Sequence, residues 1–184
     1  MKFLLGLITA ILITGVASAQ HGNTPPGHVN IGLKGGLNLY NIHNDDNIKY
    51  DSRVGYHFGL LGHIHFDNHF AFQPEIVYSA QGAKPKNLDY INVPVLFQYM
   101  FDNGFRLQAG PQVGFLIRAD NKNDLKPIDF GLSAGASYVF PPTGFGVDAR
   151  YNFGLTNINK NGAVNSTNRG FQFGIFYIFK YNNK

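Results

Sequence analysis

The chain has 184 residues, which at about 150 residues per domain allows one domain. Its 15 Lys and Arg against 11 Asp and Glu give a formal charge of +4 without a clustered basic run, which excludes a typical nucleic-acid binder. A hydrophobic content of 44% excludes a disordered chain. The lack of cysteine excludes disulfides and Cys-ligated metals. The 22 Gly and 17 Phe residues indicate β structure.

The first 19 residues have the three parts of a secretory signal peptide. Lys2 supplies the positive charge, residues 3–16 form an uncharged apolar stretch, and Ala17, Ser18 and Ala19 give the small-residue cleavage pattern. We therefore expect cleavage after Ala19 and export of a single domain at residues 20–184. No cysteine follows the apolar stretch, so a lipoprotein anchor is excluded. An uncleaved membrane anchor is the alternative.

The exported part carries the pattern of β-strands throughout. No further run of 18 apolar residues is present, so no membrane-spanning helix is predicted. Instead, apolar residues alternate with polar residues or glycine, and this period of two is typical of strands. In the last segment Phe171, Phe173, Ile175 and Tyr177 fall on one face. Eight such segments are predicted, at residues 29–39, 54–66, 70–81, 91–101, 105–117, 128–138, 145–156 and 170–179.

The connections between these segments alternate in length. Links of turn residues are predicted at 67–69, 102–104 and 141–144, and longer polar loops at 41–52, 82–89, 118–126 and 157–168. Short turns on one side and long loops on the other are typical of an outer-membrane barrel with its turns in the periplasm. The predicted fold is all-β: an eight-stranded antiparallel up-and-down transmembrane β-barrel with short periplasmic turns and longer extracellular loops.

A soluble barrel of the lipocalin type would show the same alternation with the apolar face inward. The composition of the two faces favours the membrane barrel. The polar face is rich in glycine, which would destabilise an exposed strand but makes room for long charged side chains inside a narrow barrel. The apolar face carries more Phe and Tyr than an eight-stranded interior can hold, and aromatic residues near the strand ends suit the two membrane interfaces.

Several strings resemble one known family. They are GLKGGLNLYNI from Gly32, FQPEIVYSAQGAK from Phe72, INVPVLFQYMF from Ile91, LQAGPQVGFLI from Leu107 and DARYNFGLTNI from Asp148. Together they are similar to the outer-membrane β-barrel domain family of Bacteroidetes, the PorT-like "porin family" proteins. The resemblance implies an eight-stranded barrel similar to small OmpA/OmpX-type proteins, located in the outer membrane, with no catalytic residues to transfer.

Charged residues on the polar face form the candidate site. A lumen ion-pair network, structural or acting as a gate, is predicted from Lys34, Glu75, Arg106, Asp129, Asp148 and Arg150. Counting positions from the turns places Lys34, Glu75, Asp148 and Arg150 near mid-height. Because buried charges must be paired or cost several kcal/mol each, a structural network is favoured over a proton or ion gate.

Catalytic and metal sites are not expected. His63 and His65 lie on one face at strand spacing, with His57 further along, but two imidazoles without a third ligand more often fill a polar lumen than bind zinc or copper. Ser79 and Ser133 have no evident His or Asp companions. We therefore expect no enzyme, no cofactor and no metal.

The predicted function is that of an integral outer-membrane protein with a structural or surface-interaction role and a lumen filled by side chains. The alternatives are a small-solute or ion channel and, third, a soluble periplasmic ligand-binding barrel. The expected partners are outer-membrane lipid, the barrel-assembly machinery and a surface partner bound through the long loops. We expect a monomer, because a closed barrel leaves no strand edge to satisfy.

Overall fold

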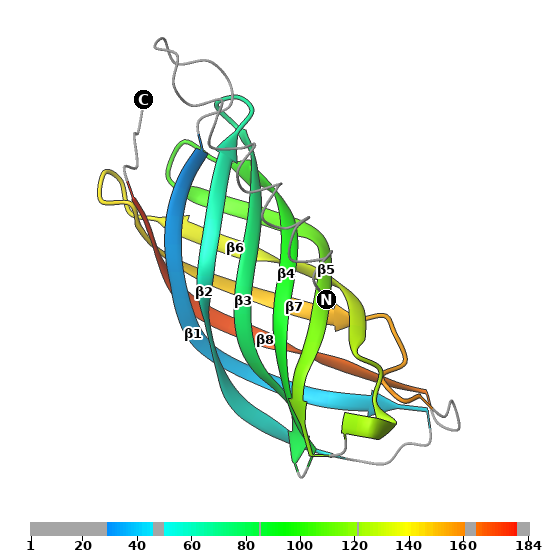
Figure 1. Ribbon diagram of the computed structural model, residues 1–184. Helices are drawn as coiled ribbons and strands as arrows, with labels where there is room; N and C mark the ends of the chain where they lie inside the picture. Colours follow the sequence, from blue (N-terminus) through cyan, green and yellow to red (C-terminus); the bar gives the residue numbers. More distant parts are fainter. Residues whose placement is uncertain (1–28, 46–49, 85, 121, 161–164, 180–184) are drawn as a thin grey trace.

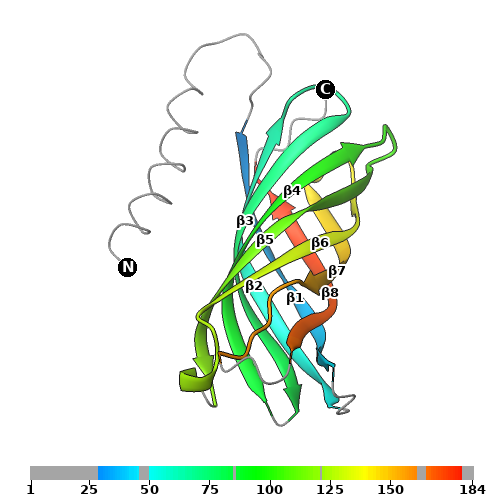
Figure 2. The ribbon, with the colours of Figure 1, turned by 90° about the vertical axis from the view of Figure 1, so that its right-hand side faces the viewer.

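Eight antiparallel strands close into a barrel in the computed structural model, which describes residues 29–45, 50–84, 86–120, 122–160 and 165–179. The predicted signal peptide lies outside these residues. Each strand pairs with its neighbours in sequence, and β1 pairs with β8 (Figures 1 and 2). The strands are β1 (Val29–Asn44), β2 (Asp51–His65), β3 (Phe70–Lys84), β4 (Asn87–Met100), β5 (Phe105–Ala119), β6 (Ile128–Val139), β7 (Phe145–Gly154) and β8 (Ser166–Ile178). The predicted fold is confirmed.

The two faces of the barrel wall follow the period-two pattern. Inward positions are buried and mostly polar, whereas every strand exposes large apolar side chains on the outside. Examples, one from each strand in order, are Leu33, Phe58, Phe70, Phe97, Leu107, Phe130, Phe153 and Phe173. A surface of this kind matches the lipid-facing band of a membrane barrel. Among the residues that the structure describes, no helix is long and apolar enough to cross a membrane.

Aromatic residues gather toward both ends of the outer face. Near the turns, Tyr99 contacts Phe70 and Phe101 with ring centroids 5.3 and 4.9 Å apart. Toward the loops, Tyr151 contacts Phe153 and Phe171 at 4.3 and 4.7 Å. Tyr and Phe thus occupy the heights at which amphipathic and apolar rings meet the two interfaces of a bilayer.

The three predicted turns connect β2 to β3, β4 to β5 and β6 to β7 at one end of the barrel. Gly104 and Gly144 have φ values of 90° and 73°, which residues with a side chain rarely adopt. In the first turn the backbone N–H groups of His69 and Phe70 donate to Asp67 Oδ1 at 2.7 and 2.8 Å. These hydrogen bonds hold the pKa of Asp67 below its usual value.

The other end carries the loops, and the strands extend further into them than predicted: β1 continues to Asn44, β2 begins at Asp51 and β8 begins at Ser166. A long loop is predicted at 82–89, but β3 continues to Lys84 and β4 begins at Asn87. The strands continue because Ala83 and Leu88 are buried inside the barrel, and Gly82 at φ 97° allows the tight reversal. The remaining three connections are longer, and the one after β5 contains a short 3₁₀ turn, η2 (Lys122–Asp124).

Candidate functional site

Four of the six predicted lumen residues form a closed network of ion pairs. Arg150 donates from Nη1 and Nη2 to Glu75 Oε2 and Oε1 at 3.0 and 2.9 Å, and from Nε to Asp148 Oδ2 at 2.9 Å. The Nζ atom of Lys34 lies 3.2 Å from Asp148 Oδ2 and 3.4 Å from Glu75 Oε2. All four side chains are buried, with at most 2% of their surface exposed. We call these residues the quartet. Its two positive and two negative charges balance.

Glycine on neighbouring strands makes room for the quartet. Lys34 pairs across to Gly59 on β2, Asp148 to Gly174 on β8, and Arg150 to Gly135 on β6. A β-carbon at Gly174 would come within 2.6 Å of Asp148 Oδ1, and one at Gly135 within 2.7 Å of the Arg150 β-carbon. The narrow interior therefore has room for long charged side chains where the cross-strand neighbour is a glycine, which has no side chain.

The other two predicted residues lie elsewhere. Arg106 is buried near the turn end of β5, where its Nη1 lies 3.3 Å from His63 Nε2. Asp129 is the second residue of β6, at the loop end. No salt bridge within the described residues joins either side chain to the quartet. Strand alternation predicts which face a residue occupies, but the tilt of the strands separates residues of that face by height.

Layers of uncharged polar side chains lie on both sides of the quartet, and the sequence prediction assigned them no role. Toward the turns, Gln73 Nε2 donates to Glu75 Oε1 at 2.7 Å, and Gln98 Nε2 donates to Gln73 and Gln108 at 3.0 and 2.8 Å. Toward the loops, Asn38 Nδ2 donates to Ser79 Oγ at 3.0 Å, and Asn38 Oδ1 lies 2.8 Å from His57 Nδ1. All of them occur at inward positions of the alternating pattern, which is the signal that identifies them.

Of the three histidines considered as metal ligands, His57 and His63 are part of this filling. His63 is fully buried beside Arg106, and its ring meets the ring of His65 edge-on at 4.3 Å between centroids. His57 bonds to Asn38 in the layer on the loop side of the quartet. Within the described ranges, no group of three His, Asp or Glu side chains is placed to hold a metal ion.

Buried apolar side chains cluster at each end of the interior. At the turn end Leu61, Val139, Phe176 and Ile178 pack together. At the loop end lies a larger group, the mouth cluster, which consists of Ile42, Ala83, Leu88, Tyr90, Leu116 and Ile158. The polar layers therefore lie between two apolar clusters.

One member of the mouth cluster comes from the loop between β7 and β8. Ile158 is 3% exposed, its N–H donates to Ser166 O at 2.8 Å, and its carbonyl accepts from Lys126 N at 2.8 Å. Leu125 and Asn159 form a β-bridge beside it. The described part of the loop thus inserts Ile158 among the inward side chains at the loop end.

Replacing Ile158 with alanine is expected to release this loop without unfolding the barrel. Removing a buried Ile side chain costs about 2–5 kcal/mol, and here the loss falls on the loop and not on the strands. Limited trypsin digestion should cut after Lys160 at least about tenfold faster in the variant. The control is Leu155→Ala, because Leu155 is 63% exposed in the same loop. Equal cleavage rates in the variant and the parent would show that Ile158 does not hold the loop.

A pocket of about 330 Å³ opens beside the mouth cluster at the loop end. Its floor is apolar, from Ile42, Leu88, Leu125 and Ile158, and its rim is polar. The rim residues are Lys86, Asn87, Asp120, Asp124, Asn159 and Ser166. We call this the mouth pocket. An apolar floor with a polar rim is the usual arrangement of a binding site.

The comparisons with known proteins agree with the barrel and its lipid-facing surface. Residues 18–160 match the family model of the outer membrane protein beta-barrel domain. The structure is similar to Neisserial surface protein A, with a TM-score of 0.56, 12% identity, and 83% of this chain and 99% of that chain covered. It is also similar to Ail, the attachment invasion locus protein of Yersinia pestis, with a TM-score of 0.56, 14% identity, and coverage of 82% and 98%.

No curated protein sequence matches the chain. At these identities the two solved structures show the fold alone, whereas the family model covers most of the chain. On this evidence the chain belongs to the outer membrane protein beta-barrel domain family and is a protein of the outer membrane.

Proposed function

We propose that this outer-membrane barrel is a scaffold whose lumen is plugged by side chains, and that its loop end binds a surface partner. The filling of the interior is the observation that supports this proposal. Apolar clusters lie at both ends, and the polar layers and the charge-balanced quartet lie between them. An eight-stranded barrel is only wide enough for its side chains to fill it. A solute would have to displace both apolar clusters and break the ion pairs.

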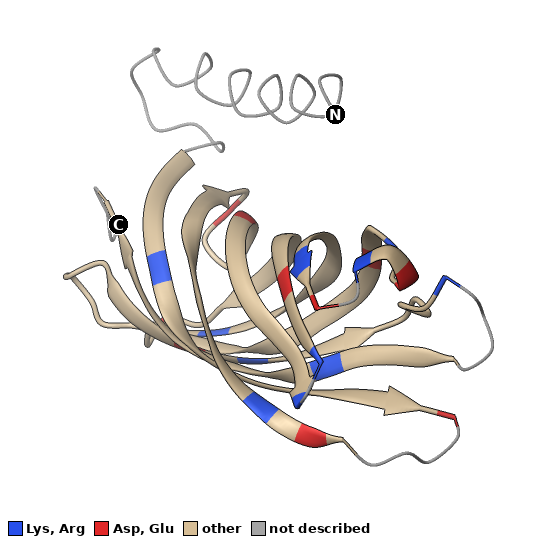
Figure 3. Cartoon of the chain, turned by 60° about the horizontal axis from the view of Figure 1, so that its bottom comes forward, with Lys and Arg blue, Asp and Glu red and all other residues tan. Residues whose placement is uncertain are grey.

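The distribution of charge supports a role for the loop end. In the described chain, the exposed acidic and basic residues of the turn end are Asp67 and Asp102, since Arg106 is buried, whereas charged residues gather on the loops and on the adjoining strand ends (Figure 3). The mouth pocket, with its apolar floor and charged rim, lies at the same end. The surface partner predicted from the sequence would meet the protein there.

The finer assignments are also proposals. The strings that resemble the PorT-like proteins of Bacteroidetes support placing the chain in that branch of the family. We also propose that the signal peptide at residues 1–19 directs export and that the barrel-assembly machinery inserts the protein. The resulting barrel is a monomer, is not an enzyme and has no cofactor. The closed sheet supports the monomer, because no strand edge is left unpaired among the described residues.

Conductance in planar bilayers separates the plugged barrel from a channel. The purified protein should give no steady current steps, because both apolar clusters stay in place. In the channel alternative the quartet is a gate, and steady steps should appear whose size changes in the Glu75→Gln or Arg150→Gln variant. Such steps would overturn the plugged lumen and leave the family assignment intact.

A further inference from the structure

The outer surface of the barrel changes from apolar to polar in a short distance near the loops, across β7, β8 and β1. Leu39 pairs with Phe171, which pairs with Tyr151, so one cross-strand row is apolar. The next row toward the loops contains Asn41 and Arg169, and the row after it His43 and Thr167. A pocket of about 740 Å³ spans this boundary. Its lining includes Leu39, Asn41, His43, Tyr151, Arg169 and Phe171.

Three buried polar atoms in these rows have no hydrogen-bond partner. They are Asn41 Oδ1, Thr167 Oγ1 and Arg169 Nε. Within the described part of the chain the Arg169 guanidinium forms no salt bridge, although Asp51 also lines the pocket. The Asn41 amide nitrogen is already used, because it donates to Tyr50 O at 2.9 Å and to Ser52 Oγ at 3.3 Å. Asn41 and Arg169 line the pocket, so an acceptor and a cation are left there for a ligand.

We propose that this pocket binds an outer-leaflet lipid whose headgroup carries a phosphate. The acyl chains would lie on the row of Leu39, Phe171 and Tyr151, and the phosphate oxygens would accept hydrogen bonds from Arg169. Arginine presents several donors in a planar fork and suits phosphate. A basic side chain at the level where the apolar band ends is placed to meet an anionic headgroup. This inference does not depend on the plugged lumen.

Native mass spectrometry of the barrel released from neutral maltoside micelles tests the proposal. Phosphatidic acid is titrated against diacylglycerol with the same chains, which lacks only the phosphate. The parent protein should retain one phosphatidic acid more tightly than diacylglycerol. Arg169→Gln should weaken phosphatidic acid retention at least about fivefold, which corresponds to roughly one charge at a membrane surface. Arg169→Lys should retain phosphatidic acid less tightly than the parent but more tightly than Arg169→Gln, because lysine keeps the charge without the planar set of donors.

Arg118→Gln is the matched control. Arg118 lies near the loop end of β5, away from the pocket, and its side chain is 76% exposed. The control should retain the lipid as the parent does, and an equal loss would mean that overall charge alone attracts the lipid. Equal retention of both lipids by the parent, or unchanged retention in Arg169→Gln, would overturn the proposal. Displacement of the lipid by equimolar glycerol 3-phosphate would show a site for free phosphate instead. If Arg169→Gln does not fold, the parent and Arg169→Lys decide.

Discussion

Glu75→Gln should lower the free energy of unfolding by about 3–5 kcal/mol, the usual cost of removing one partner from a buried ion pair. The carboxylate accepts two hydrogen bonds from Arg150 and lies 3.4 Å from Lys34 Nζ. Glutamine keeps the volume but removes the negative charge, so the quartet is left with a net positive charge in a buried interior. The measurement is urea unfolding in detergent micelles, followed by circular dichroism and by gel mobility without boiling.

Two further variants test the cause of this loss. Asp102→Asn removes the same charge from a fully exposed carboxylate at the turn end and should leave stability unchanged. Combining Glu75→Gln with Lys34→Met restores the charge balance and should recover part of the lost stability. An unfolding free energy within about 1 kcal/mol of the parent for Glu75→Gln alone would contradict the structural role of the quartet.

The second large effect is expected from a pair of adjacent glycines on β1. Gly36 faces the lumen, and a β-carbon there would lie 2.0 Å from Phe173 O and 2.6 Å from the Gly174 α-carbon. These are backbone atoms of β8, which cannot move without shifting the strand. Gly36→Ala should therefore destabilise the barrel by about 1–3 kcal/mol or prevent its closure. Refolding yield on unboiled gels and urea unfolding give the result.

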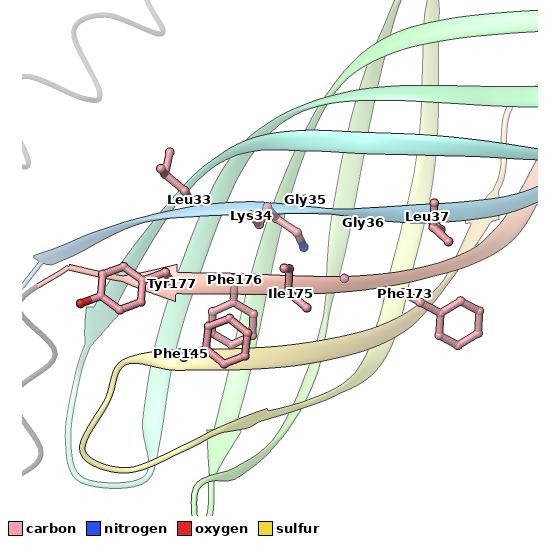
Figure 4. A pocket seen from close by; sticks show the side chains of 11 residues that line it. Leu33, Lys34, Gly35, Gly36, Leu37, Phe145, Phe173, Ile175, Phe176 and Tyr177 are labelled. Carbon is pink, nitrogen blue, oxygen red and sulfur yellow. The ribbon is translucent and has the colours of Figure 1, made fainter.

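Gly35 provides the control because it faces outward. A β-carbon there would meet nothing closer than 3.5 Å. It lies in a groove of about 610 Å³ on the lipid-facing surface, among Leu33, Leu37, Phe173 and Ile175 (Figure 4). Gly35→Ala should be neutral or slightly stabilising, because alanine restricts the unfolded chain more than glycine does. Equal losses in the two variants would mean that the inward and outward faces of β1 are not as described.

Much of the fold could be predicted from the sequence because a barrel repeats one simple rule. Alternation assigns Phe171, Phe173 and Ile175 to the outside and Gln172 to the inside, and the structure places them so. The loop predicted between β3 and β4 is too long, because the polar stretch around Lys84 and Lys86 resembles a loop. The buried Ala83 and Leu88 keep the strands paired there.

The site could be predicted in part. Counting positions from the turns places the quartet at a common height, and the structure brings these four residues together. It does not bring Arg106 to them, because Arg106 is the second residue of β5 after the turn and therefore lies near the turn end. The insertion of Ile158 into the mouth depends on long-range loop packing, for which neither strand period nor turn composition gives a signal.

The claim on which the rest depends is that the apolar face points outward into lipid. Refolding the protein with and without detergent, followed by gels of boiled and unboiled samples, tests it most directly. We expect a β-rich circular dichroism spectrum and a mobility shift on boiling in detergent, and aggregation when detergent is left out. A protein that folds and stays in solution without detergent would contradict the account, because its apolar face would then have to point inward.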